Sequence, residues 1–498
     1  AGASFSSGRT SGTTLLLARD ETPTLRSASM LPSRIQSSPS LARTIESSTS
    51  QVLKILPDSV APPKASLRST IFNLLSTCLG AGMLAMPHVM QEVGVVGGLV
   101  LLVVVPLLSD RSIYLTTKTA DLSGAESLTA SAELALGGGG GVFAAATLIL
   151  FNYGICISYS IVIKGLLPPL VVAVGGTAPS PVVALAVVSA TCLVPLTSLR
   201  SMEDFKYASL ACVGLIAVFT GFVIYAGLAT ALGLAGADGQ RLRAPPLRMI
   251  SLSPLSWLRT LPLAAFAYLC HMNVPYLYDH LRARPAGASR WPSKATKMQL
   301  ASRVAMTACF VLYSAEALAG YVTFGTGEFD GLDCSANILQ CLYTRGGGES
   351  GGGGGGGGSG ESGSDGAVGE GDAPIPLPLP PMAVRLLHAA FALVLICSYP
   401  TVSFGLRNAL HACLPRTDGP PSLGARWLEA AFVVGASFGV AAAVDDLGLV
   451  FAIIGATTGT LLMLILPAAI FLGLHRRATA QAHDGPRDGP RDGPRDGP

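Results

Sequence analysis

The stretch NLLSTCLGAGMLAMPHVM, residues 73–90, decides the fold of this chain. It is apolar enough to lie in a bilayer, yet Gly80 and Gly82 stand in its middle and Pro87 follows them. Glycine permits backbone dihedrals outside the helical region, and proline removes a backbone donor. Inside hydrocarbon an unpaired backbone group is costly, so a helix unwinds at mid-depth only where it faces protein or a polar cavity. The stretch therefore predicts a membrane helix that is broken at a binding site.

The composition places the whole chain in a membrane. Of its 498 residues, 50% are hydrophobic and only 13% are charged, and the mean hydropathy is +0.53. A spanning helix needs roughly 20 mainly apolar residues, and the apolar runs predict about ten of them. The predicted class is an all-α polytopic membrane protein. The expected spans are residues 69–91, 95–118, 142–168, 180–197, 206–234, 257–279, 299–325, 383–405, 427–444 and 447–474.

The segments around and between the spans differ in composition. Residues 1–66 are rich in Ser, Thr and Pro, which predicts a disordered tail, although a transit peptide has a similar composition and stays an alternative. The transmembrane domain is expected at residues 67–475. Within it, residues 326–381 hold a glycine run and PIPLPLPP, which predicts a flexible loop. Residues 476–498 repeat DGPR and form a low-complexity tail.

The positive charges predict the orientation. Lys and Arg concentrate before the first span, between the sixth and seventh, after the eighth and after the tenth. These joints fall on one side of the membrane, so the positive-inside rule places both termini in the cytoplasm and the loop 326–381 on the other side. Three arginines between the fifth and sixth spans run against this assignment, namely Arg241, Arg243 and Arg248. Whether Cys334 and Cys341 pair in the loop is left open.

A second apolar run is interrupted in the same way. LPLAAFAYLCHMNVPYLYDHL, residues 261–281, contains Cys270 to Asn273 at its middle and then Pro275. Broken segments at the start of each group of five spans point to two inverted repeats around a midplane site. The ends of the half-helices then face a small zwitterion, with N-termini toward its carboxylate and freed carbonyls toward a cation. The sequence therefore predicts a secondary transporter built on a five-plus-five plan.

Five segments carry a resemblance to a known family. They are FNLLSTCLGAGMLAMP (72–87), FAYLCHMNVPYLYDHL (266–281), GYVTFG (320–325), SYPTVSFGLR (398–407) and FAIIGATTGTLLMLILPAAIF (451–471). Together they resemble the amino acid transporter family of the amino acid/auxin permease type, which includes sodium-coupled neutral, proton-coupled and vacuolar members. The resemblance implies a LeuT-like fold, transport of amino acids, and residence in the plasma membrane or in a vacuolar or lysosomal membrane.

Two departures from the family bear on the coupling ion and on the span count. Sodium-coupled neutral members carry a second Asn three residues after the one that matches Asn73, and this chain has Ser76 there. Ser398 matches a hydroxyl that serves the cation in the family, so the resemblance leaves both H⁺ and Na⁺ as coupling ions. The family has a further helix after the tenth span, and whether truncation has removed it here is left open.

The residues of the two breaks are the candidates for contacting a substrate. The competing interpretation of the glycines is close helix packing through small residues. For His271, the favoured interpretation is a structural or gating role near the site. The predicted substrate-binding residues are Gly80, Ala81, Gly82, Met83, Phe266, Cys270 and His271.

Four polar residues are candidates for the coupling ion: Asn73, Ser76, Ser398 and Glu316. Serines in membrane helices often bond back to their own helix, which is the alternative for the two serines. An ionisable group deep in a span is a functional hypothesis by default, so Glu316 either carries a proton or is a neutral structural donor. Lys164, near a span end, is expected to reach the interface by snorkelling.

Enzyme chemistry is not indicated. The sequence shows no nucleophile elbow, phosphate-binding glycine loop or HExxH motif in a usable context, and no metal-ligand spacing. We therefore expect no enzyme, no metal or organic cofactor and no nucleic acid partner. The expected function is alternating-access transport of amino acids, above all neutral L-amino acids, driven by H⁺ or Na⁺, with spans one, two, six and seven moving together. The alternatives are a non-transporting amino acid sensor of the same fold and an ion channel, for which no charged filter is visible.

Overall fold

The computed structural model describes the membrane-spanning part of the chain. It covers residues 65–173, 175–199, 206–235, 241–242, 244, 246–282, 293–325, 380–413 and 422–483. The predicted N-terminal tail up to residue 64, the loop from 326 to 379 with Cys334 and Cys341, and the tail from residue 484 lie outside the described residues. Within the described residues the structure is helical, with two isolated β-bridges and no strand.

The helices follow one another along the whole described chain. They are α2 (Leu67–Cys78), η2 (Ala81–Ala85), α3 (Met86–Ser123), α4 (Leu128–Leu136), α5 (Gly138–Ala173), α6 (Pro181–Val188), η3 (Ser189–Leu193), α7 (Val194–Thr197), α8 (Lys206–Ala231), α9 (Pro254–Ala267), η5 (His271–Asn273), α10 (Val274–His280), α11 (Lys294–Phe324), α13 (Pro381–Cys413), α14 (Leu423–Ala443), α15 (Leu447–Ile454), η6 (Gly455–Gly459), η7 (Leu461–Ile465) and α16 (Leu466–His483). Elements η2 and η5 are 3₁₀-helices, whereas η3, η6 and η7 are π-helical turns. The 3₁₀-helices stand where the chain re-enters the helical conformation after each break.

Seven helices of the described part are long and apolar enough to cross a membrane. They correspond to the second, third, fifth, seventh, eighth, ninth and tenth predicted spans. The fourth is the shorter apolar run Pro181–Thr197, in which a π-helical turn joins α6 to α7. The first and sixth are each divided into shorter helices. The predicted all-α architecture with broken first and sixth spans is therefore confirmed.

The first and second predicted spans are joined without a loop. Helix α3 runs through the joint with a kink at Gly94, whose φ is 82°. Backbone hydrogen bonds hold the kink to the segment before α9, from Val95 N–H to Arg248 O (3.1 Å) and from Ser251 N–H to Val93 O (2.9 Å). A Cβ at Gly94 would lie 2.7 Å from backbone atoms of that segment, so both the dihedral and the close approach require glycine.

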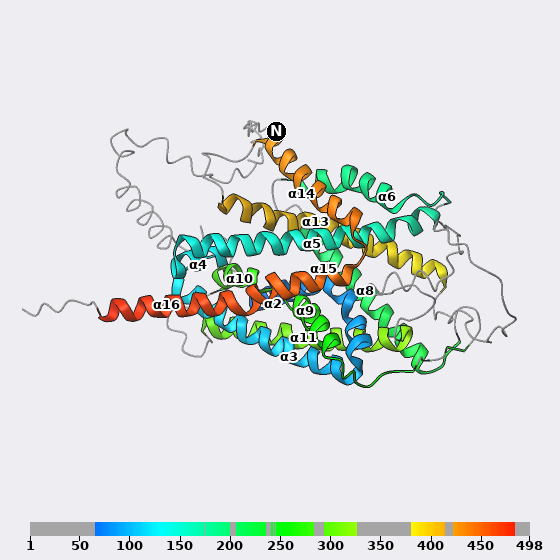
Figure 1. Ribbon diagram of the computed structural model, residues 1–498, viewed down its shortest axis with the longest axis horizontal. Helices are drawn as coiled ribbons and strands as arrows, with labels where there is room; N and C mark the ends of the chain where they lie inside the picture. Colours follow the sequence, from blue (N-terminus) through cyan, green and yellow to red (C-terminus); the bar gives the residue numbers. More distant parts are fainter. Residues whose placement is uncertain are drawn as a thin grey trace, which may run out of the picture. The chain divides into compact units, whose positions relative to one another are not determined.

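Packing divides the long helices into two groups (Figure 1). Helix α11 packs along α3 and contacts α2, and α9 and α10 also contact α3. The second group forms around α5, which packs against α13, α14 and α6. Helix α8 contacts both α11 and α13, and α15 contacts both α9 and α5, so these two elements connect the groups. The first group contains predicted spans one, two, six and seven, the set expected to move together.

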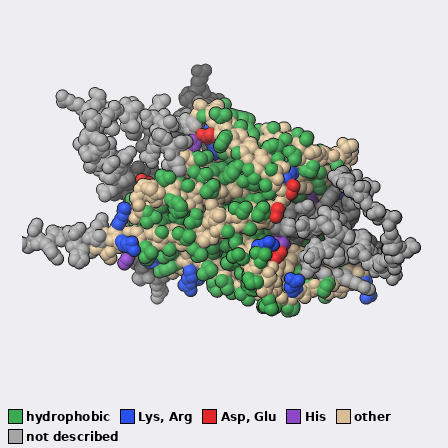
Figure 2. All heavy atoms as spheres, in the orientation of Figure 1, with side chains coloured by type: hydrophobic (Ala, Val, Ile, Leu, Met, Phe, Trp, Pro, Cys, Tyr) green, Lys and Arg blue, Asp and Glu red, His purple; other side chains and the backbone are tan. Residues whose placement is uncertain are grey.

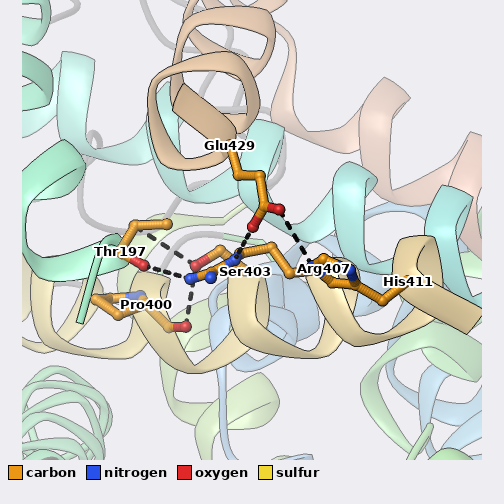
Figure 3. A network of polar contacts seen from close by, with 6 residues as sticks. All are labelled: Thr197, Pro400, Ser403, Arg407, His411 and Glu429. Carbon is orange, nitrogen blue, oxygen red and sulfur yellow. Dashed lines mark hydrogen bonds and ion pairs between the residues drawn. The ribbon is translucent and has the colours of Figure 1, made fainter. Parts of the chain in front are cut away.

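A polar network fixes one end of the second group (Figure 3). Arg407 of α13 is 7% exposed, and its Nε donates to Glu429 Oε2 of α14 at 3.1 Å. Its Nη1 donates to the carbonyl oxygen of Thr197 of α7 at 2.8 Å. His411, one turn further along α13, has its Nε2 3.2 Å from Glu429 Oε1. The guanidinium thus ties together the three helices α7, α13 and α14.

Lys164 ties α5 to the C-terminal end of α14. Its side chain is buried, donates to the carbonyl oxygens of Ala441 and Val444, and pairs with Asp445 at 2.7 Å. A cation at a helix C-terminus is favoured by the helix dipole and by the free carbonyls there. The ammonium group caps the end of α14 beside the exposed Asp445, and the predicted snorkelling to the interface stays a prediction.

The start of α2 is fastened to the end of α10. Ala65 N–H donates to His280 O at 2.8 Å, and Arg282 N–H donates to Ala65 O at 3.1 Å, which forms a β-bridge between Ala65 and Leu281. In two inverted repeats, the entry to the first span and the exit from the sixth lie on the same side of the membrane. The bridge therefore joins the two broken spans at that side.

The outer surface of the described helices is apolar. Figure 2 shows hydrophobic side chains over the middle of one face, with lysines and arginines toward its ends. Large apolar side chains on several spans are more than half exposed, among them Leu107, Leu150 and Phe432. This apolar surface suits contact with lipid, because moving apolar side chains from water into hydrocarbon costs no free energy.

Candidate functional site

The first break separates α2 from η2. Helix α2 ends at Cys78, and Gly80 is extended, with φ −138° and ψ −151°. The Gly80 N–H donates back to Cys78 O at 2.8 Å, and Met83 N–H donates to Gly80 O at 3.2 Å. The peptide groups between the two helices thus leave the regular helical hydrogen-bond pattern at the position that the glycines predicted.

The second break separates α9 from η5. Helix α9 ends at Ala267, and residues 268–270 precede η5. The hydroxyl of Ser109 on α3 donates to Tyr268 O at 3.1 Å and so pairs a carbonyl within the break. The Tyr268 hydroxyl reaches Leu102 O, also on α3, at 3.4 Å. Helix α3 therefore supports the second break through both backbone and side chain.

The two breaks lie against each other. A Cβ placed on Gly82 would be 3.0 Å from Ala267 Cα and 3.5 Å from the Phe266 ring, so glycine lets η2 contact the end of α9. Gly80 points elsewhere, because a Cβ placed there would meet the hydroxyl of Tyr159 on α5 at 3.8 Å. The first break thus packs tightly within its own helix group and faces the second group through Gly80.

Tyr313 of α11 joins the two breaks. Its hydroxyl lies 2.6 Å from the carbonyl oxygen of Cys78, the last residue of α2, and 3.2 Å from that of Ala267, the last residue of α9. The side chain is fully buried, and its ring packs edge-on against Tyr268 with centroids 5.2 Å apart. Sequence reasoning missed this residue. The available signal was a tyrosine in the middle of an apolar span, where a phenol hydroxyl needs a partner.

Three buried thiols lie close together at the junction of the two breaks. The Cys78 side chain lies beside those of Cys270 and Cys309, and all three cysteines are free and buried. They come from α2, the second break and α11. Among the described residues, no group of His, Cys, Asp and Glu is arranged to hold a metal ion. Cys270 therefore packs on the end of α2, which places it at the junction of the breaks.

Apolar side chains line the neighbourhood of the breaks. The Phe266 ring stacks on that of Phe451 of α15, with centroids 4.6 Å apart, and its centroid is 6.0 Å from that of Phe151 of α5. Met83 is fully buried. The side chain of Ala81 lies outside the described part of the structure. Phe266 thus connects the second break to the other helix group.

Two predicted ionisable residues are fully buried. His271 opens η5, with its ring beside the backbone of Ser109. Glu316 of α11, one turn beyond Tyr313, has no hydrogen-bond partner for either carboxyl oxygen among the described residues. An isolated buried carboxylate costs far more than the neutral acid. The surroundings of Glu316 therefore suit a carboxyl that holds a proton.

The four ion candidates do not form one cluster. The Ser76 hydroxyl donates to Asn73 O at 3.0 Å in its own helix, as the alternative interpretation expected, and the Asn73 side chain is exposed. Ser398 of α13 has its Oγ 3.9 Å from Cys212 Sγ of α8. Within the described ranges, no hydrogen bond joins the candidates of α2 to Ser398 or to Glu316. Their joint role in binding a cation stays a prediction.

Comparison with known proteins relates the chain to transporters. Residues 63–327 match the family model described as transmembrane amino acid transporter protein. The chain is 26% identical over 269 residues to amino acid transporter AVT6E of Arabidopsis thaliana, an alignment that covers 52% of this chain and 53% of that protein. It is 27% identical over 265 residues to vacuolar amino acid transporter 6 of Saccharomyces cerevisiae, covering 52% of this chain and 56% of that protein. The chain thus spans about half the length of the curated relatives it matches.

A solved structure shares the fold. The inward-facing conformation of Mhp1 aligns with a TM-score of 0.54 at 12% identity, over 84% of this chain and 80% of that one. At this identity the likeness concerns the fold alone. The predicted LeuT-like arrangement of a polytopic membrane protein is thereby confirmed.

Proposed function

Because the chain belongs to the transmembrane amino acid transporter protein family, a family of transporters and not of enzymes, we propose that it is a secondary active transporter that moves amino acids by alternating access. The proposed substrates are neutral L-amino acids, and the proposed coupling ion is the proton, with Na⁺ as the alternative. The proposed location is the plasma membrane or a vacuolar or lysosomal membrane. The observation that carries the proposal is the contact of the two helix breaks at Gly82 and Ala267, with Gly80 facing α5.

The ends of the half-helices supply the partial charges that a zwitterion needs. Helix C-termini are partly negative. Helix α2 ends at Cys78 and α9 ends at Ala267, and their last carbonyl oxygens lie on either side of the Tyr313 hydroxyl. The backbone N–H groups after Gly80 begin η2, which continues into α3, and they are partly positive. We expect the α-carboxylate of the substrate at these N–H groups and its ammonium group near the carbonyl oxygens.

The side chains beside the breaks favour a neutral substrate. Met83, Phe266 and Tyr159 offer apolar or phenolic surface and carry no charge at neutral pH. A charged substrate side chain buried there requires a countercharge, because an unpaired charge is expensive in a dry site. We therefore propose that the site binds alanine, serine and other small neutral amino acids more tightly than lysine or glutamate.

Glu316 supports the proton as the coupling ion. It is fully buried on α11, and neither carboxyl oxygen has a partner among the described residues. Its position one turn from Tyr313 keeps it close to the ends of α2 and α9. A carboxyl in such surroundings gains a proton readily and is held neutral until it regains contact with water.

The bridge between Ala65 and Leu281 supports alternating access. With the orientation predicted from the positive charges, this bridge lies at the cytoplasmic side. It keeps the start of α2 with the end of α10 inside the first helix group, while the Arg407 network holds the second helix group together. The proposed cycle therefore moves the first group of helices against the second, as expected from the order of the broken spans.

The test is uptake of labelled neutral amino acids into proteoliposomes that contain the full chain. A pH gradient, a Na⁺ gradient and no gradient are compared, and we expect accumulation with the pH gradient. Gly80→Leu directs a side chain toward Tyr159 and is expected to abolish uptake. The matched control is Gly439→Leu on α14, because nothing lies within 4 Å of a Cβ at that position. Gly82→Leu is a poorer test, since its side chain presses on the backbone of Ala267 whatever the substrate does.

The outcomes separate the alternatives. A sensor of the same fold binds the labelled amino acid and does not accumulate it. Accumulation driven by Na⁺ and not by the pH gradient would assign the other coupling ion. Unchanged uptake by Gly80→Leu would contradict the proposed binding site, because a Leu side chain cannot share the space beside Gly80 with a substrate.

A further inference from the structure

Two negative helix ends converge on one uncharged group. The carbonyl oxygens of Cys78 and Ala267 close α2 and α9, and both lie within hydrogen-bond distance of the Tyr313 hydroxyl, at 2.6 Å and 3.2 Å. The dipoles of both half-helices therefore point their negative ends at the same atom. In transporters with broken helices, such half-helix ends and freed carbonyls are the groups that coordinate a monovalent cation.

The hydroxyl is held firmly between these carbonyls. Tyr313 is 0% exposed, and its ring is fixed edge-on against Tyr268, whose own carbonyl accepts from Ser109. Helix α11 is continuous through this position and packs along α3 and against α2. The donor is therefore part of the rigid framework of the first helix group. A phenol has one proton, so the shorter contact to Cys78 takes it, and Ala267 shares it at the longer distance.

From this geometry we propose that the Tyr313 hydroxyl substitutes for a cation at the two breaks, so that the site assembles without Na⁺. The proposal rests on the proposed transport function and specifies its ion requirement. The hydroxyl pairs the two helix ends as a bound Na⁺ would, and it adds no charge. Tyr313 is accordingly a positioning residue, which keeps the ends of α2 and α9 together while the substrate binds beside them.

The test compares Tyr313→Phe with the native chain in NaCl and in choline chloride of equal ionic strength. The variant keeps the ring and removes the donor. Two measurements are made on the full chain: the KM for labelled amino acid uptake at a fixed pH gradient, and the melting temperature of the purified protein without substrate. The matched control is Tyr321→Phe on the same helix, which loses a hydroxyl that accepts from Arg248 N–H at 2.8 Å.

The expected result is a salt-specific response in one variant. The native chain should show the same KM and melting temperature in both salts. In choline chloride, Tyr313→Phe should raise the KM by about tenfold, the effect of removing the Tyr313 donor from the buried Ala267 carbonyl, since Cys78 O still accepts from Gly80 N–H. NaCl should restore much of the affinity and raise the melting temperature of this variant. Tyr321→Phe should respond equally to the two salts, because its hydroxyl is remote from the helix ends.

Several results would overturn the proposal. A native chain that is stabilised by NaCl and not by choline chloride already binds the cation. A Tyr313→Phe variant that matches the native chain, or that loses affinity equally in both salts, shows that the hydroxyl has only a structural role. If Tyr313→Phe does not fold, Tyr313→His keeps a ring and an N–H donor, and Na⁺ dependence of that variant counts against the proposal. A native chain that accumulates no amino acid contradicts the proposed function, and the melting temperatures still decide the role of Tyr313.

Discussion

Glu316→Gln is expected to uncouple transport from the proton gradient and to leave the fold intact. Neither carboxyl oxygen of Glu316 has a hydrogen-bond partner among the described residues, and glutamine has the same size, so the substitution breaks no observed contact. We expect the free energy of unfolding to change by less than about 1 kcal/mol. A pH gradient of one unit supplies about 1.4 kcal/mol per proton, which drives about tenfold accumulation if one proton moves with each substrate.

The assay is steady-state accumulation in proteoliposomes with the membrane voltage clamped to zero. The native chain should reach about tenfold accumulation per pH unit, and Glu316→Gln should equilibrate substrate without concentrating it. Exchange of labelled for unlabelled substrate should persist, because it needs no net proton movement. The matched control is Glu133→Gln, on the exposed surface of α4, which should behave as the native chain does. Accumulation by Glu316→Gln at the native level would refute the reasoning, since the proton would then travel through another group.

Three further substitutions test the framework through thermal unfolding in detergent. Gly94→Ala should cost about 1–3 kcal/mol for its backbone dihedrals alone, whereas Gly439→Ala, with open space around its Cβ, should be neutral or stabilising; equal melting temperatures would contradict the account of the kink. Glu429→Gln keeps an amide oxygen beside Arg407 and removes the negative charge that neutralises the buried guanidinium. Because Glu429 is 30% exposed, the expected loss is about 1–3 kcal/mol, below that of a fully buried pair; a larger loss would mean that water does not screen the pair. Lys164→Met removes the cap of α14 and should cost about 1–2 kcal/mol, and an unchanged melting temperature would show that the cap is dispensable.

The broken helices were predictable because their cause is local. Gly80, Gly82 and Pro87 in one apolar run, and the polar residues before Pro275 in another, interrupt a helix wherever it is placed. The joint between the first two spans was harder to predict. A kink at Gly94 replaces a loop there, and the backbone bonds that hold the kink come from a segment more than 150 residues away in the sequence.

The candidate site was predictable in its backbone and less so in its side chains. The predicted glycines stand at the breaks, but the sequence does not reveal that Gly82 packs on Ala267 while Gly80 faces α5. Tyr313 was missed because its role depends on two carbonyls from other helices, and backbone atoms leave no signature in a sequence. The partners of Lys164 were not predictable for a similar reason, since they are carbonyl oxygens at the end of α14.

The bridge at Ala65 has a consequence for the mobility of α2. It consists of two backbone hydrogen bonds, which together contribute about 2 kcal/mol net, so thermal energy alone releases it in a few per cent of molecules. A fastening of this strength holds the start of α2 against the end of α10 in most molecules and still opens without a chemical step. A disulfide or a buried ion pair at the same place would keep the two segments joined in nearly every molecule.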